Sequence, residues 1–237
     1  MRIIPLLLMF LLAAAASSSE YTRLEPVLEQ LGIEVSPESL TPAPIRGFLE
    51  VTRGMQVLYV AADGSMVLDG EILSVATATN LTERRRASIR RELLRSIAKE
   101  EAILVPASEP VVARIFVFID TNCPYCVSLH RGHEELRRRG IEIQYLFYPR
   151  SGPASASFKQ AVAVWCSNDR LAALEDSLGG VMMPEARCPN PVRKHYDLAQ
   201  QLELKGTPAV IAANGAIRYG MISADDIAEL ARGAEEH

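Results

Sequence analysis

Residues 111–126 read VVARIFVFIDTNCPYC. The run Val111–Ile119 is almost continuously apolar and rich in β-branched residues, which predicts a strand buried on both faces. A helix is expected over residues 124–139, because Pro124 fits the first helical turn and Gly140 follows as a stop. The Cys-x-x-Cys pair therefore stands between the end of a buried strand and the start of a helix.

This position favours the charged form of the first cysteine. The unpaired N–H groups and the dipole at a helix N-terminus stabilise negative charge, and the pKa of a thiol there can fall to roughly 3.5–7.5. We predict that Cys123 is a thiolate nucleophile in thiol–disulfide exchange, and that Cys126 resolves the mixed disulfide formed on Cys123. Two other interpretations stay open: an inert disulfide within the pair, or a zinc site completed by His130 and His133.

The sequence after the pair predicts alternating strands and helices. Asn214-Gly215 is a strong hairpin signal between two short apolar runs. The order is β-α-β, then helices, then β-β-α, which is the thioredoxin arrangement. The predicted fold class is thus a thioredoxin-like α/β domain with a helical insertion. We expect strands over 141–148, 209–212 and 216–219, and helices over 155–178, 191–203 and 224–235.

Gly206-Thr207-Pro208 comes directly before the strand expected at residue 209. Thioredoxin-like enzymes carry a cis-proline at this place, opposite their active-site cysteines. A cis bond would expose the backbone of Thr207 to an extended substrate segment, whereas a trans proline would simply open the strand. The predicted substrate-binding residues are Thr207, Pro208, Pro124 and Tyr125.

The chain has four cysteines, which allow three pairings. If Cys123 pairs with Cys126, the remaining two, Cys166 and Cys188, are the natural second pair. We predict a structural disulfide between them; a redox relay from this pair to Cys126 is the alternative.

The first residues of the chain predict export. Arg2, an apolar run and the small residues Ala13–Ser19 have the pattern of a cleaved signal peptide over residues 1–19. The run is shorter than the about 20 residues that span a membrane. Disulfides persist in exported proteins, and we expect a periplasmic location. The net charge of -4, with 49% hydrophobic and 23% charged residues, is typical of a soluble globular protein and does not suggest nucleic acid as a partner.

Residues 20–81 predict a small α+β domain. A short helix is expected over 20–35, and Asp63-Gly64 lies between two apolar segments, 55–61 and 65–68, as in a β-hairpin. So small a sheet buries little apolar surface by itself. We therefore expect this domain to be a dimerisation domain.

A helix over residues 82–102 is predicted to connect this domain to the thioredoxin-like domain, residues 103–237. Thr82 can cap the helix, and arginines surround its narrow apolar stripe. Such a basic helix could bind a membrane or nucleic acid. A solvated connector that packs along one side is the interpretation we favour.

Several motifs together resemble the DsbC/DsbG family of periplasmic disulfide isomerases over nearly the whole mature length. They are Gly32-Ile33, LTPAPIR at 40–46, VLYV at 57–60 with Asp63-Gly64, Asp120-Thr121, YLFYPR at 145–150, AVWC at 163–166 and GTPAV at 206–210. The resemblance implies a homodimer joined through cystatin-like N-terminal domains, with an apolar cleft that holds misfolded, disulfide-containing proteins. It also implies a membrane reductase of the DsbD type that keeps Cys123 and Cys126 reduced. We expect no cofactor and no metal.

Two details distinguish branches of that family. Pro124-Tyr125 is the dipeptide associated with DsbG, whereas a Cys166/Cys188 pair resembles DsbC. We expect a disulfide isomerase with chaperone-like substrate binding. The alternatives are a DsbG-like reductase of sulfenylated cysteines and a holdase chaperone without redox activity. Val117 stands where thioredoxin has a buried aspartate, so that proton acceptor is not carried over.

Overall fold

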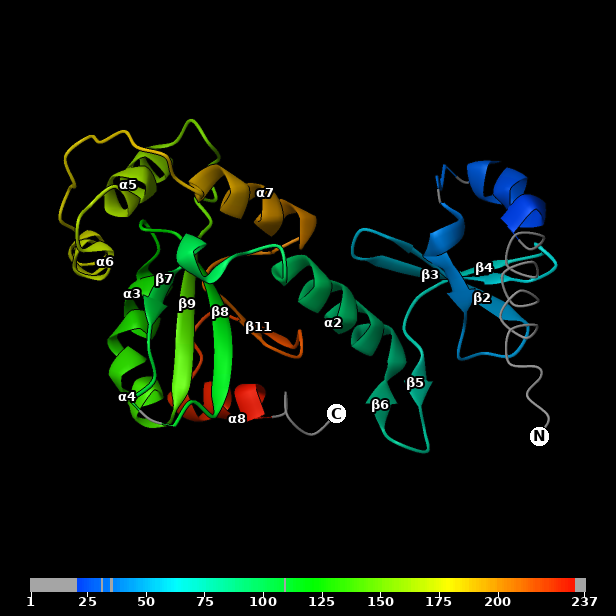
Figure 1. Ribbon diagram of the computed structural model, residues 1–237. Helices are drawn as coiled ribbons and strands as arrows, with labels where there is room; N and C mark the ends of the chain where they lie inside the picture. Colours follow the sequence, from blue (N-terminus) through cyan, green and yellow to red (C-terminus); the bar gives the residue numbers. More distant parts are fainter. Residues whose placement is uncertain (1–20, 31, 35, 109, 233–237) are drawn as a thin grey trace, which may run out of the picture. The chain divides into compact units, whose positions relative to one another are not determined.

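The computed structural model describes residues 21–30, 32–34, 36–108 and 110–232. The signal peptide predicted over residues 1–19 lies outside them. The chain divides after Arg86 into two compact units, each with its own sheet and hydrophobic core (Figure 1). Within the described ranges, no helix is both long and apolar enough to cross a bilayer.

The N-terminal unit is built on a four-stranded antiparallel sheet in the order β1-β2-β3-β4. Residues 21–30 are helical, and Leu24 and Leu28 of this helix are fully buried in the core of the unit. The hairpin expected around Asp63 joins β3 to β4, and Asp63 Oδ1 accepts the N–H of Ser65 at 2.9 Å. The elements are η1 (Pro37–Ser39), β1 (Leu40–Pro42), β2 (Phe48–Arg53), β3 (Gln56–Ala61), β4 (Val67–Asp69), β5 (Leu73–Ser74) and β6 (Thr79–Asn80).

Helix α2 (Leu81–Leu94) begins differently from the prediction. Asn80 caps it, because its Oδ1 accepts an N–H of the first turn at 2.9 Å. Thr82 is fully buried instead: its hydroxyl lies 2.7 Å from Tyr59 Oη on β3 and accepts the N–H of Ile72 at 2.9 Å. The cap prediction for Thr82 was wrong, and this threonine fastens the helix to the sheet.

The same helix also ends earlier than the expected residue 102. After Leu94 the next three N–H groups, those of residues 95–97, bond to the carbonyls three positions back, which tightens the turn and stops the α-helix. Ile97 then enters the core of the C-terminal unit. Two elements that the sequence did not predict follow, η2 (Lys99–Glu101) and β7 (Ile103–Val105).

Several arginines of α2 make ion pairs or hydrogen bonds within the protein. In the N-terminal unit, Arg85 pairs with Glu50 at 2.6 Å and Arg86 pairs with Glu71 at 2.5 Å. In the C-terminal unit the guanidinium of Arg90 is buried and donates to the carbonyl of Gly215 at 2.6 Å. These contacts are structural and involve no partner molecule.

Gly215, in the hairpin turn between the last two strands, lies against α2. Its φ is +87°, and a Cβ added there would lie 1.9 Å from the carbonyl oxygen of Ala87. Only glycine allows both this left-handed backbone and this close approach.

The C-terminal unit contains a five-stranded sheet in the order β11-β10-β8-β9-β7. The central strand β8 is parallel to its neighbour β9, and the other three pairs of neighbouring strands are antiparallel. This arrangement confirms the thioredoxin-like fold class. The strands are β7, β8 (Ala113–Ile119), β9 (Ile141–Phe147), β10 (Ala209–Ala212) and β11 (Ile217–Tyr219).

Each of the two longest predicted helices of this unit is divided in the structure. The break in the first is at Gly132, where the ring of His133 bonds to the carbonyl of His130 at 2.6 Å and occupies an acceptor that a continuous helix would use. In the second, Asp169 caps a new helix through its side chain. The helices are α3 (Pro124–Arg131), α4 (His133–Arg138), α5 (Ala156–Trp165), α6 (Arg170–Leu178), α7 (Val192–Gln201) and α8 (Ala224–Arg232).

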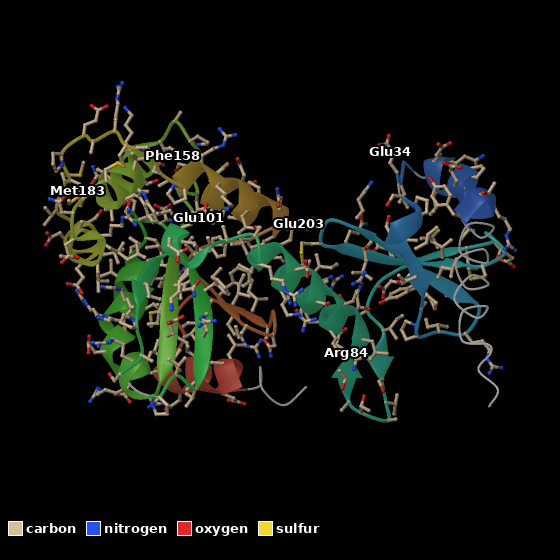
Figure 2. All side chains as sticks on the ribbon, viewed as in Figure 1. Glu34, Arg84, Glu101, Phe158, Met183 and Glu203 are labelled. Atoms are coloured by element: carbon tan, nitrogen blue, oxygen red, sulfur yellow. A yellow bond between two sulfur atoms is a disulfide. The ribbon has the colours of Figure 1, made fainter. Side chains whose placement is uncertain are left out.

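Side chains that alternate along β8 and β9 supply two cores, one on each face of the sheet. On one face, Val117 and Tyr145 pack with residues from α3, α4, α5, α6 and α8. On the other face, Phe118 and Leu146 pack with α7 and with the end of α2. Figure 2 shows Phe158 on α5, which packs at the margin of the first core.

His195 of α7 is a titratable group within this interior. It is fully buried, with its ring close to those of Phe147 and Trp165. The N–H of Phe147 donates to Nδ1 at 3.3 Å, so the neutral ring carries its proton on Nε2, which has no partner among the described residues. Burial lowers the pKa of His195 to about 4.

We expect the stability of the protein to decrease as the pH falls from 6.5 toward 4. In that window an unfolded histidine binds a proton that buried His195 does not, so acid favours the unfolded state, by at most about 1.4 kcal/mol per pH unit. Urea unfolding at a series of pH values measures the slope. His195→Asn, which keeps an acceptor near the N–H of Phe147, should show a shallower slope. Equal slopes in the two proteins would contradict the assignment.

Candidate active site

The structure places the Cys-x-x-Cys pair at the junction predicted from the sequence. Strand β8 ends at Ile119, and Cys123 is the N-cap residue of α3, with Pro124 in the first turn. Asp120, in the loop between them, is 3% exposed; its carboxylate accepts the N–H of Asn122 and both the N–H and Nε–H of Arg150. Asp120 therefore fastens the loop to the segment after β9 and fixes where Cys123 emerges.

Cys123 faces the loop before β10. Its sulfur is 3.3 Å from the carbonyl oxygen of Thr207, and the Thr207–Pro208 peptide is cis. The structure thus brings together residues that are far apart in the sequence. Pro124 and Tyr125 lie at the surface beside them, with Tyr125 55% exposed.

The surroundings of Cys123 favour its thiolate. Burial opposes the charged form, but hydrogen bonding from the side chain of Thr207 and from the backbone N–H groups of Cys126 and Tyr125 outweighs burial, so the pKa of Cys123 is lowered. The Thr207 hydroxyl is buried and makes no hydrogen bond with the described residues, so it is available to donate to the sulfur. A lowered pKa increases the fraction of Cys123 that is thiolate at a given pH.

Cys126 has the opposite character. It is completely buried, and burial together with the neighbouring Cys123 raises the pKa of its thiol. Both cysteines are free thiols in this structure. Cys123 is 2% exposed and Cys126 is 0% exposed, so the pair combines a nearly buried thiol of lowered pKa with a completely buried thiol of raised pKa.

We expect iodoacetamide to alkylate Cys123 at pH values below the 9.0 of an ordinary thiol, and to spare Cys126. The rate follows the thiolate fraction, so a lowered pKa moves the midpoint of the rate–pH profile to lower pH. Thr207→Val removes the hydroxyl and should move the midpoint upward. Thr121→Val, in the loop before Cys123, is the matched control. Mass spectrometry identifies the modified residue, and a midpoint unaffected by Thr207→Val would remove the role given to its hydroxyl.

The zinc site considered from the sequence is not assembled. In the part of the chain that the structure describes, the one cluster of at least three potential ligands joins His130, His133 and Glu175, and neither cysteine belongs to it. The rings of the two histidines stack 4.5 Å apart, and Nδ1 of His130 is 3.0 Å from Tyr145 Oη. Sequence reasoning missed Tyr145 and Glu175, because no local motif marks either residue.

The other two cysteines form a disulfide. Cys166, the C-cap residue of α5, is bonded to Cys188 in the loop before α7, with a Cα–Cα distance of 5.8 Å and a sequence separation of 22. The bond ties the helical insertion to the following loop. Met183 of that loop lies close to the core of the unit (Figure 2).

Comparison with known proteins gives concordant matches for both units. The profile of a thioredoxin-like domain matches residues 101–234, and that of the disulfide bond isomerase protein N-terminal domain matches residues 12–83. The thiol:disulfide interchange protein DsbC of Escherichia coli is 31% identical over 216 residues, which cover 90% of this chain and 89% of that protein. DsbC of Haemophilus influenzae is 29% identical over 215 residues, or 91% of each chain.

A solved structure shares the fold of part of this chain. The crystal structure of a disulfide interchange protein from Neisseria gonorrhoeae matches with a TM-score of 0.50 and 24% sequence identity. The match covers 57% of this chain and 99% of that chain.

Proposed function

The chain belongs to the family of DsbC thiol:disulfide interchange proteins, and on that premise we propose that it is a periplasmic disulfide isomerase. The observation that supports this most directly is the position of Cys123. Its sulfur lies at the start of α3, beside the carbonyl of Thr207, with its pKa lowered. This is the arrangement a nucleophilic thiolate needs to meet an extended segment of another protein.

The reaction begins when the Cys123 thiolate attacks one sulfur of a substrate disulfide. A new S–S bond forms to Cys123, the substrate S–S bond breaks, and the second substrate sulfur leaves as a thiolate. If another substrate thiolate then attacks the mixed disulfide, a rearranged substrate disulfide forms and the Cys123 thiolate is regenerated. This isomerisation involves no net oxidation or reduction.

Cys126 provides the second route from the same intermediate. Once deprotonated, its sulfur attacks the Cys123 sulfur, which releases the substrate thiol and leaves a Cys123–Cys126 disulfide. The substrate is then reduced by two electrons and the enzyme oxidised by two. The raised pKa of buried Cys126 slows this step and gives the substrate time to rearrange.

Substrate binding is assigned to the surface around the cis peptide. The Thr207–Pro208 peptide lies beside the Cys123 sulfur, and exposed Pro124 and Tyr125 flank the sulfur. The N–H of Gly220 donates to the carbonyl of Pro208 at 3.0 Å, which brings the segment of exposed Tyr219 and Met221 next to this loop. Exposed apolar side chains beside the thiolate suit unfolded or misfolded chains as substrates.

We assign dimerisation to the N-terminal unit, within the proposed range of residues 20–81. Its sheet ends in the three-residue strand β4, and large apolar side chains are exposed just before, on and after this strand. They are Met66, Leu68, Leu73 and Val75, which are 57%, 38%, 66% and 97% exposed. Apolar surface beside a sheet edge favours pairing with a second copy of the chain.

Two further parts of the proposal concern the cell. Residues 1–19 act as the export signal, and residues 82–102 form the connector to a catalytic domain over 103–237. An isomerase must keep Cys123 reduced in an oxidising compartment, so a membrane reductase of the DsbD type is the proposed electron donor.

The test is the recovery of activity by scrambled, fully oxidised ribonuclease in a mildly reducing glutathione buffer. We expect recovery with the wild-type protein and none with Cys123→Ala. If the protein is redox-active but gives no recovery, the second candidate function is favoured, which is the reduction of sulfenylated cysteines. The Pro124-Tyr125 dipeptide is the sequence feature that supports this candidate. Full activity of Cys123→Ala in preventing aggregation, without exchange, would identify a holdase. Light scattering after gel filtration measures the molar mass and so tests whether the protein is a dimer.

A further inference from the structure

Three side chains gather on the C-terminal unit apart from the two thiols. His130 lies near the end of α3, His133 begins α4 and Glu175 belongs to α6. One donor atom from each lies within 4.8 Å of the others. The Nε2 atoms of His130 and His133 are 3.7 and 3.9 Å from the same carboxylate oxygen of Glu175. The three donor atoms thus surround one small space.

The hydrogen bonds of His133 determine which of its two ring nitrogens carries a proton and which carries a lone pair. Its Nδ1 is 2.6 Å from the carbonyl oxygen of His130, and a carbonyl can only accept, so Nδ1 carries the proton. In the neutral ring, Nε2 is then an acceptor. It faces two carboxylates, Glu134 at 3.2 Å and Glu175 at 3.9 Å, which also only accept. A positive charge between these acceptors would satisfy all of them.

His130 supplies the second, independent observation. The residue is 6% exposed, and its Nε2 has no hydrogen-bond partner among the described residues. Its Nδ1 lies 3.0 Å from the hydroxyl of Tyr145. When Nδ1 donates to that hydroxyl, Nε2 carries a lone pair, and it lies 3.7 Å from the Glu175 oxygen. Metal-binding histidines commonly use their second nitrogen in this way to hold the ring in place.

We propose that His130, His133 and Glu175 form a binding site for a divalent transition-metal ion, of which Zn²⁺ best suits the ligands. Two imidazole nitrogens and one carboxylate oxygen are a ligand set that zinc takes, with a water molecule in the fourth position. Zinc–ligand distances of about 2.0–2.2 Å require the donor atoms to be roughly 3.5 Å apart. Glu175 can approach the ion because its side chain is 48% exposed and can turn inward. The two imidazole rings, stacked 4.5 Å apart at 16° in this structure, must also turn apart on binding, because a metal ion lies in the plane of each ring that binds it.

The site differs from the cysteine-containing one that the sequence suggested, yet it lies close to the reactive pair. Tyr145, which contacts His130, belongs to the same buried cluster as Cys126. A metal on Nε2 of His130 would fix the proton on Nδ1 and hence the hydrogen bond to Tyr145. Metal binding itself does not depend on disulfide exchange, so it can be tested whether or not the proposed isomerase function is correct.

The experiment is calorimetric titration of Zn²⁺ into the full, tag-free chain. Cys123 and Cys126 are first oxidised to a disulfide, so that no thiolate can bind the ion, and His237 is replaced by glutamine in every sample. We expect one Zn²⁺ per chain. Glu175→Gln should weaken binding by at least about tenfold, because even the loss of an outer partner of a metal ligand costs about 10–100-fold. Asp176→Asn, the adjacent exposed carboxylate, is the matched control and should bind like the parent.

A second measurement identifies the ligand atoms. In ¹⁵N-resolved spectra of the histidine rings, Zn²⁺ should shift Nε2 of His130 and His133 and leave His195 unchanged. Equal affinities of Glu175→Gln and Asp176→Asn would overturn the site. The site would also be overturned if no Zn²⁺ bound and the spectra showed both nitrogens of His133 protonated. That result would mean that an ion pair between His133 and Glu175 satisfies the cluster. Because Glu175 is at the surface, its variant should fold even if a histidine variant does not.

Discussion

Cys123→Ala is expected to remove disulfide isomerisation completely and leave only the uncatalysed rate. Every route in the proposed mechanism begins with a bond to the Cys123 sulfur, and Cys126 cannot replace it because the pKa of its buried thiol is raised whereas that of Cys123 is lowered. The measurement is the rate of ribonuclease reactivation at a fixed glutathione ratio. Circular dichroism of the variant serves as the control for folding.

Cys126→Ala provides the complementary result. The variant keeps the nucleophile but lacks the thiol that reduces the mixed disulfide, so covalent complexes with reducing substrates should accumulate on Cys123. Non-reducing electrophoresis followed by mass spectrometry detects them. Isomerisation should be retained in part, since the substrate's own thiols can release the enzyme. Complexes formed equally by the Cys123→Ala variant would contradict the assignment of the two roles.

Removal of the Cys166–Cys188 disulfide is expected to cause the largest loss of stability. A bridge with a sequence separation of 22 restricts the unfolded chain. In the chain-entropy treatment, a loop of this length contributes about 3 kcal/mol to the free energy of unfolding. For a chain of this size such a loss lowers the melting temperature by roughly 6–12 °C.

The double variant Cys166→Ala/Cys188→Ala tests this in thermal unfolding without a reducing agent. Its control is Cys123→Ala/Cys126→Ala, which keeps the bridge and removes two thiols that close no loop in the reduced protein. The first variant should melt well below the second. Similar melting temperatures would mean that the folded insertion is held by its packing, with little contribution from the bridge.

The fold class could be predicted because the decisive signals are local. The apolar run before the Cys-x-x-Cys pair and the Asn214-Gly215 turn each specify one element, and their order specifies the topology. The early end of α2 and the strand β7 could not be predicted in this way. They depend on Ile97 entering a core built mostly from α7 and the sheet, which no local pattern reveals.

In the candidate site, too, the residues marked by local motifs could be predicted and those placed by tertiary packing could not. Cys123, Cys126 and the Thr207-Pro208 peptide were marked by short motifs, and the structure brings Cys123 and Thr207 into contact. The packing of Tyr145 against His130 was not visible, because a tyrosine inside a buried strand resembles any other core residue. The break at Gly132, which turns His133 toward His130, depends on a side-chain hydrogen bond that periodicity does not encode.

The four cysteines of this chain stand in two opposite states, with one pair bonded and the other as thiols. An unfolded precursor has no means of keeping the pairs distinct, since all four sulfurs are equally accessible before the sheet forms. Maturation must therefore include an oxidation that closes Cys166–Cys188 and that leaves, or is followed by the return of, Cys123 and Cys126 as thiols. A catalyst of disulfide rearrangement is in this sense also a client of the disulfide-forming pathway, and its biogenesis is subject to the errors that it corrects in others.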